Sequence, residues 1–491
     1  MFNKINLNTD KIFYVLLSLL FVLTIQIFDI YKGNANHLIH SIKFFDDNKL
    51  QNDWIANQEH HIPLFAYFNY LLIKVFSGKS IYFIHSILLA ICSLFLFLIS
   101  KNLFPKLKIR NLYIIWFAFF TIFYHENSFF SGVAGQSVID AGYQPASYGV
   151  LFFIGIYFFL IEKNFLSIFF ICLGASFHPT YVLHSGFLLL GILGYNFWFK
   201  KYLNCLKILI IYSLLVLPIT LFIIINFLTI DKNLILIGQE ILLKRIPHHA
   251  DIHNWLSYKD TYFFVTYFYS LYLIRNNKRF FIFFAIFGLC PIVLSIFQYF
   301  VSINSLALAF PWRSSVFITP ITTIIILSHF LEKIKLEEFK LKLVSYFLLL
   351  ITITFFFVKS HYIKNLNSEF KNKLILTKEI KKNFNLIDRI LVPTHLQYIR
   401  MNSGLPIFVD WKHHAFRYDQ IIEWKQRVKI ADEFYISKSE NEKLLTLKKI
   451  QDIENISHIL IKKNDLKVDC YNLIDHEEFA LVSAKDCYEN K

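Results

Sequence analysis

Carboxylates gather after the first long apolar run of the chain, within residues 31–80. Asp53 stands beside Trp54 in the sequence Asn-Asp-Trp, and an aromatic side chain can hold such a loop at a membrane surface. A carboxylate held there can take a proton from a hydroxyl group or bind Mg²⁺ or Mn²⁺. Asp53 is therefore the candidate base or metal ligand, and Asp29, at the end of the first run, is its substitute. For either residue, an ordinary solvated carboxylate is the alternative.

A second polar cluster lies in residues 230–259 and reads Lys-Arg-Ile-Pro-His-His-Ala-Asp-Ile-His from residue 244. Arg245, His248 and His249 are candidates for contacts with a phosphate or a sugar hydroxyl group. Asp251 and His253, together with Asp53, are weaker candidates for a metal site. Their spacing is not that of a regular zinc site, and the proline at residue 247 disfavours a helix that would align the histidines.

Two further polar residues lie where apolar runs begin or meet. Arg313 opens a run in the sequence Pro-Trp-Arg-Ser-Ser. An arginine at the edge of a membrane is unfavourable unless it is paired or reaches the lipid head groups. It could bind a lipid-linked phosphate with the help of the helix N-terminus, or it could only contact head groups. His178 is a candidate substrate contact, with a tight turn as the alternative.

The elements that must position these residues are long apolar runs. A helix needs about 20 mostly apolar residues to cross a bilayer. The sequence predicts eleven spans, near residues 12–30, 81–99, 111–124, 145–161, 165–178, 180–198, 208–229, 260–274, 280–301, 313–330 and 343–357. The Lys and Arg clusters between them predict a cytoplasmic N-terminus and place residues 31–80, 125–144 and 230–259 outside. Within the first of these loops, residues 62–77 are expected to form an interfacial helix.

The last quarter of the chain differs sharply in charge. Residues 359–491 hold 42 of the 85 Asp, Glu, Lys and Arg residues. Residues 389–393, 406–411 and 457–461 are predicted as strands and residues 419–434 as a helix with an Asp cap, which indicates a small α/β domain with a largely parallel sheet. The predicted organisation is thus a polytopic α-helical membrane domain in residues 1–357 and an extracytoplasmic α/β domain in residues 358–491. Cys470 and Cys487 in that domain could form a disulfide or remain two free thiols.

The formal net charge of +15 does not indicate nucleic acid as a partner. Residues 359–491 carry a net charge of only +4, and the remaining positive charge lies in short clusters between apolar runs. Such clusters are typical of cytoplasmic loops in membrane proteins, and no basic stripe or aromatic platform for nucleic acid is present. The expected partner is membrane lipid.

The layout resembles the GT-C class of membrane glycosyltransferases. A short first span, a long outer loop with acidic residues, many further spans and an outer C-terminal domain carry this resemblance. Residues 245–249, 311–313 and 403–412 also resemble a group of uncharacterised bacterial membrane proteins of that architecture. The resemblance implies transfer of a sugar from a polyprenyl-phosphate donor to a glycan, lipid or protein acceptor, at the outer face of a bacterial cytoplasmic (inner) membrane.

In the GT-C class, an acidic residue of the first outer loop acts as base or metal ligand, and by position this role falls on Asp53 or Asp29. The chain departs from the pattern in Gly33-Asn34-Ala35-Asn36, where asparagines stand in place of an expected acidic residue. This departure leaves a non-catalytic alternative: a transporter, flippase or scaffold of lipid-linked glycan assembly.

Overall fold

The computed structural model describes residues 3–25, 35–45, 50–125, 129–139, 142–365, 367–383, 388–465 and 470–486. The chain divides into two compact units. Unit 1 consists of Met1–Phe28, Lys79–Ile223 and Leu243–His361, and unit 2 consists of Asp29–Gly78, Ile224–Leu242 and Tyr362–Lys491. The predicted boundary after residue 357 lies close to the observed one after His361. Residues 29–78, which include most of the predicted first outer loop, belong to unit 2, in which Trp54 packs against the apolar core.

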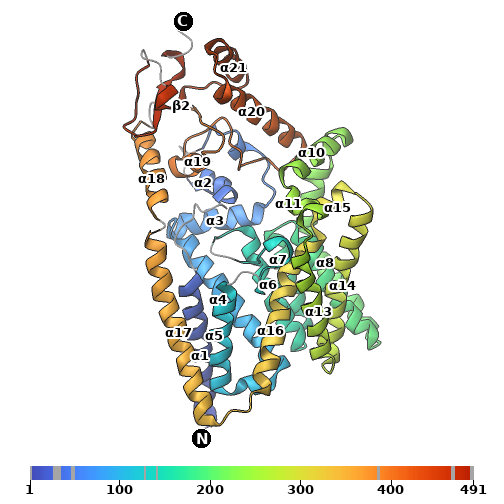
Figure 1. Cartoon of the computed structure of the whole chain (residues 1–491). Helices are drawn as coiled ribbons and strands as arrows, with labels where there is room; N and C mark the ends of the chain where they lie inside the picture. The colour runs from blue at the N-terminus through green and yellow to red at the C-terminus, as the bar shows by residue number, and fades with distance from the viewer. Residues whose placement is uncertain are drawn as a thin grey trace. The chain divides into compact units, whose positions relative to one another are not determined.

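Unit 1 is entirely helical in its described residues apart from its connecting loops (Figure 1). Its helices are α1 (Asn3–Ile25), α4 (Ser80–Leu103), α5 (Arg110–His125), α6 (Val150–Leu160), α7 (Asn164–Phe177), α8 (Tyr181–Trp198), α9 (Tyr202–Ile223), α11 (Pro247–Ala250), α12 (Ile252–Trp255), α13 (Thr261–Ile274), α14 (Lys278–Phe300), α15 (Asn304–Ala309), α16 (Ser315–Lys333) and most of α17 (Glu338–Asn365). Short 3-10 helices precede α6 at Pro145–Gly149 (η6) and α16 at Pro311–Ser314 (η9).

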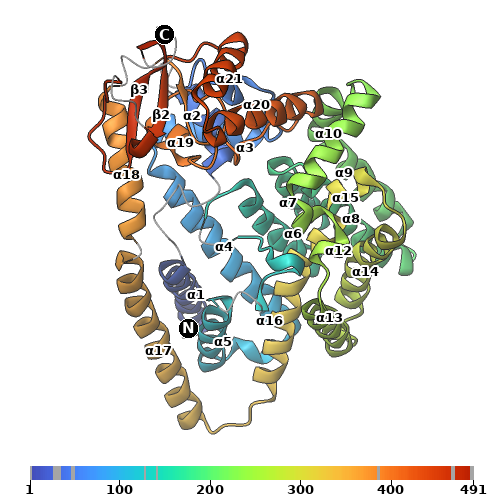
Figure 2. The same cartoon turned by 45° about the horizontal axis from the view of Figure 1, so that its top comes forward.

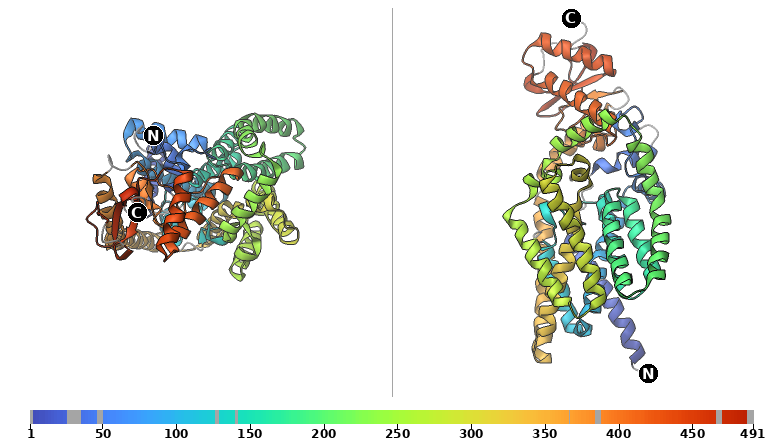
Figure 3. Two further views of the ribbon diagram at one scale, coloured as in Figure 1. Left: turned by 90° about the horizontal axis from the view of Figure 1, so that it is seen from above. Right: turned by 90° about the vertical axis from the view of Figure 1, so that its right-hand side faces the viewer.

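Helix α16 is central to the packing of unit 1. It contacts α4, α5 and α13, and most of its side chains are buried. The right-hand view of Figure 3 shows α16 running alongside the neighbouring long helices of this unit. Aromatic side chains fill the spaces between them; for example, the ring of Phe317 on α16 lies 4.8 Å from that of Phe152 on α6. The short helix η9, in which Arg313 lies directly before α16, contacts α8 and α14 as well as α16.

Each of the eleven predicted apolar runs overlaps a helix, although residues 26–30 of the first run lie outside the described residues. Within the described residues, four helical segments are both long and apolar enough to cross a membrane: Ser80–Leu103, Tyr202–Leu228, Lys278–Phe300 and Asn304–Lys333. Many leucines of α9 are exposed, namely Leu203, Leu206, Leu209, Leu214, Leu217 and Leu221. A continuous apolar surface of this kind is unfavourable in water and is typical of a helix that faces lipid. The helices of the chain thus suit a membrane protein.

Unit 2 combines helices with a small sheet (Figure 2). Its elements are α2 (Ile39–Phe45), α3 (Pro63–Phe76), most of α10 (Lys232–Arg245), α18 (Asn367–Lys382), β1 (Ile390–Leu391), α19 (Tyr398–Ser403), α20 (Tyr418–Ile436), α21 (Glu440–Ile453), β2 (His458–Lys462) and β3 (Phe479–Ser483). The strand order is β1-β2-β3, with β1 and β2 parallel and β2 and β3 antiparallel. The sheet is therefore mixed, not largely parallel as predicted.

The side chains of the sheet alternate between two apolar cores. Ile459 and Ile461 of β2 belong to the core that includes α20 and α21, whereas Leu460 belongs to the core that includes α18 and α19. This alternation follows from the two-residue period of a strand, and it places the sheet between two layers of helices. The segment 406–411, predicted as a strand, forms only an isolated parallel bridge, in which Ile407 pairs with Ile390.

Two local predictions in unit 2 have different outcomes. The predicted helix at 419–434 is confirmed as α20, but its N-cap is Arg417, and Asp419 lies within the first turn, paired with Arg417. Cys470 is disulfide-bonded, and its predicted partner Cys487 lies outside the described residues.

Candidate functional site

Arg313 lies in the short helix η9, directly before α16. Its Nη2 donates a hydrogen bond to Oε1 of Gln136 over 3.3 Å, and its guanidinium stacks 5.2 Å from the ring centre of Phe310. Phe310 has the left-handed backbone conformation (φ 51°), which costs a non-glycine residue about 1 kcal/mol. Strain of this kind is retained where the surrounding structure holds it, often at functional sites.

His249 joins Arg313 through Gln136. Nε2 of Gln136 lies 3.5 Å from Nδ1 of His249, and Nε1 of Trp312 donates to the carbonyl oxygen of His249 over 2.9 Å. The rings of His248 and His249 are 4.0 Å apart. The structure thus brings together two of the predicted substrate contacts, Arg313 and His249, and adds Gln136, which the sequence analysis did not select.

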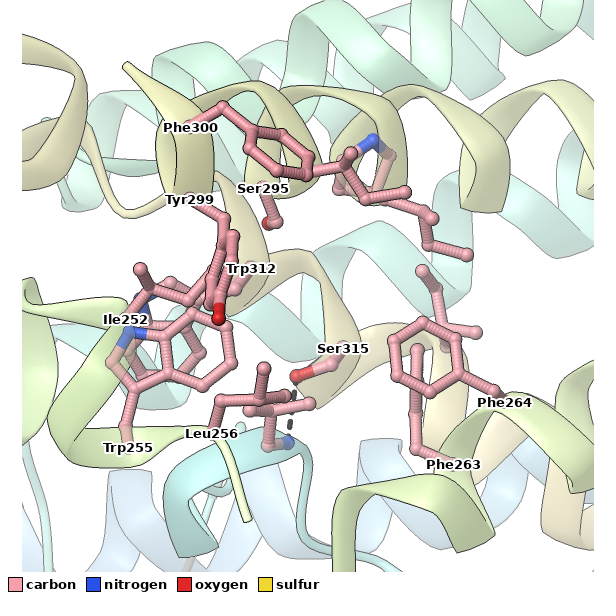
Figure 4. Close-up of a pocket in the computed structure, with 15 residues that line it drawn as sticks. Ile252, Trp255, Leu256, Phe263, Phe264, Ser295, Tyr299, Phe300, Trp312 and Ser315 are labelled. Carbon is pink, nitrogen blue, oxygen red and sulfur yellow. Dashed lines mark hydrogen bonds between the residues drawn. The ribbon is translucent and has the colours of Figure 1, made fainter. Parts of the chain in front are cut away.

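A cavity of about 340 Å³ lies beside this polar group (Figure 4). Trp312 and Ser315, on either side of Arg313 in the sequence, form part of its wall, together with Trp255 and Tyr299. Nearly all of its lining atoms are apolar. Nε1 of Trp255 is buried without a hydrogen-bond partner among the described atoms. An apolar cavity with a few polar groups at its edge is the usual form of a site for a ligand with a hydrocarbon chain.

The remaining predicted residues of this region have local roles in the structure. Arg245 is the last residue of α10. Asp251 caps α12, where its carboxylate accepts hydrogen bonds from the backbone N–H of His253 and from Nδ2 of Asn254. The ring centre of His253 lies 4.7 Å from that of Tyr299, and Tyr299 forms part of the cavity wall.

His178 lies between α7 and α8, as the predicted turn requires. Its Nδ1 is 2.8 Å from the hydroxyl of Thr180, and its ring stacks on Tyr181. One turn further along α8, Nδ1 of the fully buried His184 lies 2.8 Å from Oγ of Ser314, the residue that follows Arg313. His184 therefore supports η9 through its contact with Ser314. The sequence did not suggest this role.

Gly132 is required for the close approach of the loop that carries Gln136 to Ser315 at the start of α16. A Cβ atom at residue 132 would lie 2.3 Å from Oγ of Ser315, which accepts a hydrogen bond from the N–H of Val133. We expect Gly132→Ala to break this bond, shift Gln136 away from Arg313 and weaken ligand binding about tenfold or more, because an overpacked contact typically costs about 1–3 kcal/mol. Ligand affinity and thermal unfolding of the purified chain check this. Gly78→Ala is the matched control, since a Cβ there meets nothing within 4 Å. Equal affinity in the Gly132 variant would contradict the assignment.

Asp53 lies in unit 2, at one end of an ion cluster of Asp53, Arg400, Asp410 and His413. Its Oδ2 accepts from Nε of Arg400 over 2.8 Å and from the N–H of Ile407 over 3.1 Å, and its Oδ1 accepts from the N–H of Ala56. The side chain is completely buried. A substrate or metal ion at Asp53 would have to displace one of these donors, so its predicted role as base or metal ligand stays a prediction. Asp29 lies outside the described residues.

Asp410 is the second carboxylate of the ion cluster. It accepts hydrogen bonds from Nη1 of Arg400, from Nδ1 of His413 over 2.7 Å and from two backbone N–H groups. Burial by itself would raise the pKa of Asp410, but His413 and Arg400 outweigh burial and hold the pKa below its usual value. The carboxylate is therefore charged, and it accepts the proton of Nδ1 of His413 in a hydrogen bond.

A histidine pocket adjoins the ion cluster within unit 2. It is a small cavity lined by His37, His40, His60, His61, His413 and His414. Burial, with smaller contributions from neighbouring charges, lowers the pKa of both His37 and His40 to about 3, so both rings are neutral at pH 7. None of these six histidines was selected as a candidate from the sequence. The pairs His60-His61 and His413-His414 were the available signal, but nothing in the sequence showed that they would meet.

Among the residues that the structure describes, no group of three or more His, Cys, Asp or Glu side chains is already arranged to hold a metal ion. The metal requirement, for which Asp53, Asp251 and His253 are weak candidates, therefore stays a prediction.

Comparison with known families adds one finding. A family model described as a domain of unknown function (DUF6798) matches residues 374–431. The matched segment lies in unit 2 and includes Arg400, Asp410 and His413 of the ion cluster, as well as the first part of α20. No curated protein matches the chain.

Proposed function

We propose that the chain is a GT-C-like glycosyltransferase of the bacterial cytoplasmic membrane, which uses a polyprenyl-phosphate-linked sugar as donor at the outer face. The observation that carries the proposal is the pairing, within unit 1, of an apolar cavity with a partly buried arginine. A polyprenyl-phosphate donor has a long hydrocarbon chain and a phosphate, and these are the two parts that such a pair would bind.

The hydrocarbon chain suits the cavity between α13, α14 and α16. Phe263 and Phe264 of α13 face Tyr299 and Phe300 of α14 across it, and Trp312 forms a further wall (Figure 4). Burying a CH₂ group contributes about 0.8 kcal/mol. A few isoprene units in this cavity would therefore hold the donor firmly without any specific polar contact.

The phosphate suits Arg313. A guanidinium binds phosphate through two parallel N–H bonds, and at a helix start the backbone adds partial positive charge. His249 would contact the sugar or the phosphate from the other side of Gln136. In this proposal Arg245, His248 and His178 are further substrate contacts, and Asp53 or Asp29 is the base or metal ligand that the family resemblance implies.

The proposed topology has eleven spans, a cytoplasmic N-terminus and unit 2 outside. The eleven apolar helices and the basic clusters between them support it. The disulfide at Cys470 supports an outer location of unit 2, because disulfides persist in oxidising compartments.

The test is donor turnover by the full chain in lipid nanodiscs. A panel of polyprenyl-phosphate hexoses is added, and released polyprenyl phosphate is measured by mass spectrometry. We expect turnover with at least one donor, and we expect Ser295→Phe, which fills the cavity, to lower donor affinity about tenfold or more. Val293→Phe is the matched control, because Val293 lies on the same helix with an exposed side chain and is not part of the cavity wall.

The outcomes separate the two functional classes. Donor binding that depends on the cavity, without turnover, would favour the transporter, flippase or scaffold alternative. Absence of binding, or an equal effect of the two phenylalanine variants, would remove the cavity from the proposal.

A further inference from the structure

We propose that the histidine pocket of unit 2 is an acid-sensitive contact between two parts of the chain. It holds residues 37–40 and 60–61 against residues 413–416 while its rings are neutral, and it opens when they take up protons. All three stretches line the same small cavity. Imidazole is the side chain whose charge ordinarily changes between about pH 5 and 8, so a contact made of several such rings responds to acid.

The rings of the pocket are packed closely against one another. The ring centre of His40 lies 3.9 Å from that of His60, and the ring centre of His37 lies 5.7 Å from that of His61. Phe416 stacks against both His61 and His37, so it joins the two parts of the chain. The cavity volume is about 20 Å³, and one water molecule needs about 10–15 Å³. Charged rings could therefore not be fully hydrated while the contact is closed.

His60 makes a hydrogen bond that protonation would break. Its Nδ1 accepts from the N–H of Ile62 over 3.1 Å, and Ile62 is the N-cap of α3. A charged imidazole carries a proton on both nitrogens and accepts no hydrogen bond. Uptake of a proton by His60 would thus leave the N–H of Ile62 without this acceptor and set two N–H groups against each other.

The groups around the three rings of His37, His40 and His60 do not favour added positive charge. Besides one another, these rings face nitrogen bases, namely Lys43, Lys412, His413 and His414. Like charges at such distances repel, and the repulsion is stronger in a small cavity than in water.

Two carboxylates belong to the same region of the described structure. Glu59 lines the pocket, but its side chain is exposed and it also faces Arg417. Asp410 reaches the pocket through His413 and is already paired with Arg400. Neither carboxylate would therefore offset several new charges on the rings.

The pKa values of the three rings set the direction of the change. Burial, with smaller contributions from the neighbouring bases, lowers the pKa of His37 and His40 to about 3 and that of His60 well below its usual value of 6.5. Above pH 6.5 the rings are neutral in the closed and the open form alike. Below pH 6.5 the open form takes up protons that the closed form does not, so the closed form loses stability down to about pH 3.

Hydrogen–deuterium exchange of the full chain in detergent tests the proposal. Exchange is followed by mass spectrometry at pH 7.5, 6.5 and 5.5, and each rate is divided by that of an unstructured peptide at the same pH. We expect the protection of residues 37–45, 60–62 and 413–416 to fall between pH 7.5 and 5.5 by about tenfold for each histidine that opening exposes. The amides of β2 and β3 should keep their protection, because the opening is confined to the pocket.

The double variant His37→Gln/His40→Gln removes two of the titrating rings. Glutamine is uncharged at every pH, so the loss of protection between pH 7.5 and 5.5 should be smaller than in the unmodified chain by about tenfold or more. His395→Gln is the matched control, because His395 is exposed and lies in the same unit outside the pocket. Each ratio compares two pH values within one protein, so a variant that is less protected overall still gives a valid result.

Three results would overturn the proposal. The first is equal protection of the three segments at pH 7.5 and 5.5 in the unmodified chain, which needs no variant. The second is an unchanged loss of protection in the double variant. The third is an equal loss in β2 and β3, which would indicate unfolding of the whole unit. None of these measurements involves donor turnover, so they are independent of the proposed transferase activity.

Discussion

Asp53→Ala is expected to lower the stability of unit 2 by about 3–5 kcal/mol, because it leaves a buried guanidinium without one of its two carboxylate partners. Arg400 is about 1% exposed and contacts Asp53 through Nε, Asp410 through Nη1 and the carbonyl oxygen of Ile407 through Nη2. Asp53 and Arg400 are 347 positions apart in the sequence. The ion pair thus joins the segment around Asp53 to the C-terminal part of unit 2.

Thermal unfolding of the purified chain is measured as the fraction of protein that remains monodisperse after heating. Asp475→Ala is the matched control, since Asp475 is an exposed carboxylate of the same unit. The double variant Asp53→Ala/Arg400→Met should be more stable than Asp53→Ala, because replacing both partners with apolar groups removes the unpaired charge.

Two roles for Asp53 predict different results. If the carboxylate only stabilises unit 2, expression and thermal stability fall together with activity, and the double variant regains stability. If Asp53 is the base of the proposed transferase, glycan product is lost while expression stays intact. Unchanged stability and unchanged product in Asp53→Ala would contradict both roles.

The helical part of the fold could be predicted from the sequence because long apolar runs have few structural solutions. In a membrane every backbone group must be satisfied within the segment, so each run becomes a helix. The place of residues 29–78 in unit 2 could not be predicted, because it depends on the burial of Asp53 and the packing of Trp54 against residues more than 300 positions away. No local periodicity carries that information.

The sheet of unit 2 was only partly predictable. The apolar segment at 457–461 predicted β2 correctly, because its flanks are polar and its residues favour strands. Strand β3 is equally short, but its pairing with β2 is antiparallel and follows a long connection, and neither property is visible in a five-residue segment. The mixture of parallel and antiparallel pairing in the sheet could therefore not be predicted from the sequence.

In the candidate site, too, some residues could be predicted from the sequence and others could not. Arg313 was predictable because a charged residue at the start of an apolar run needs an explanation. Gln136 was not, since an amide in a polar loop has many ordinary roles. Its importance follows only from its position between Arg313 and His249.

Arg313→Ala is expected to lower donor turnover about a hundredfold or more, which is the usual effect of removing a donor to a developing or bound anion in a site that excludes water. Protein stability should change little. The hydrogen bond from Nη2 of Arg313 to Oε1 of Gln136 is 3.3 Å long, so its loss removes a weak contact. The effect should therefore appear in ligand binding and not in folding.

Arg313→Lys separates charge from shape. Lysine retains the positive charge but cannot form two parallel bonds to phosphate, so we expect an intermediate loss of about tenfold. Turnover and polyprenyl-phosphate affinity are measured on both variants in nanodiscs, with Arg275→Ala as the control. Arg275 is exposed at the end of α13 and stacks on Tyr272, away from the cavity wall. If Arg313→Ala retains the donor affinity of the unmodified chain, the phosphate contact must be made elsewhere. If the lysine variant equals the unmodified chain, Arg313 acts through its charge alone, because the paired geometry of the guanidinium is then not needed.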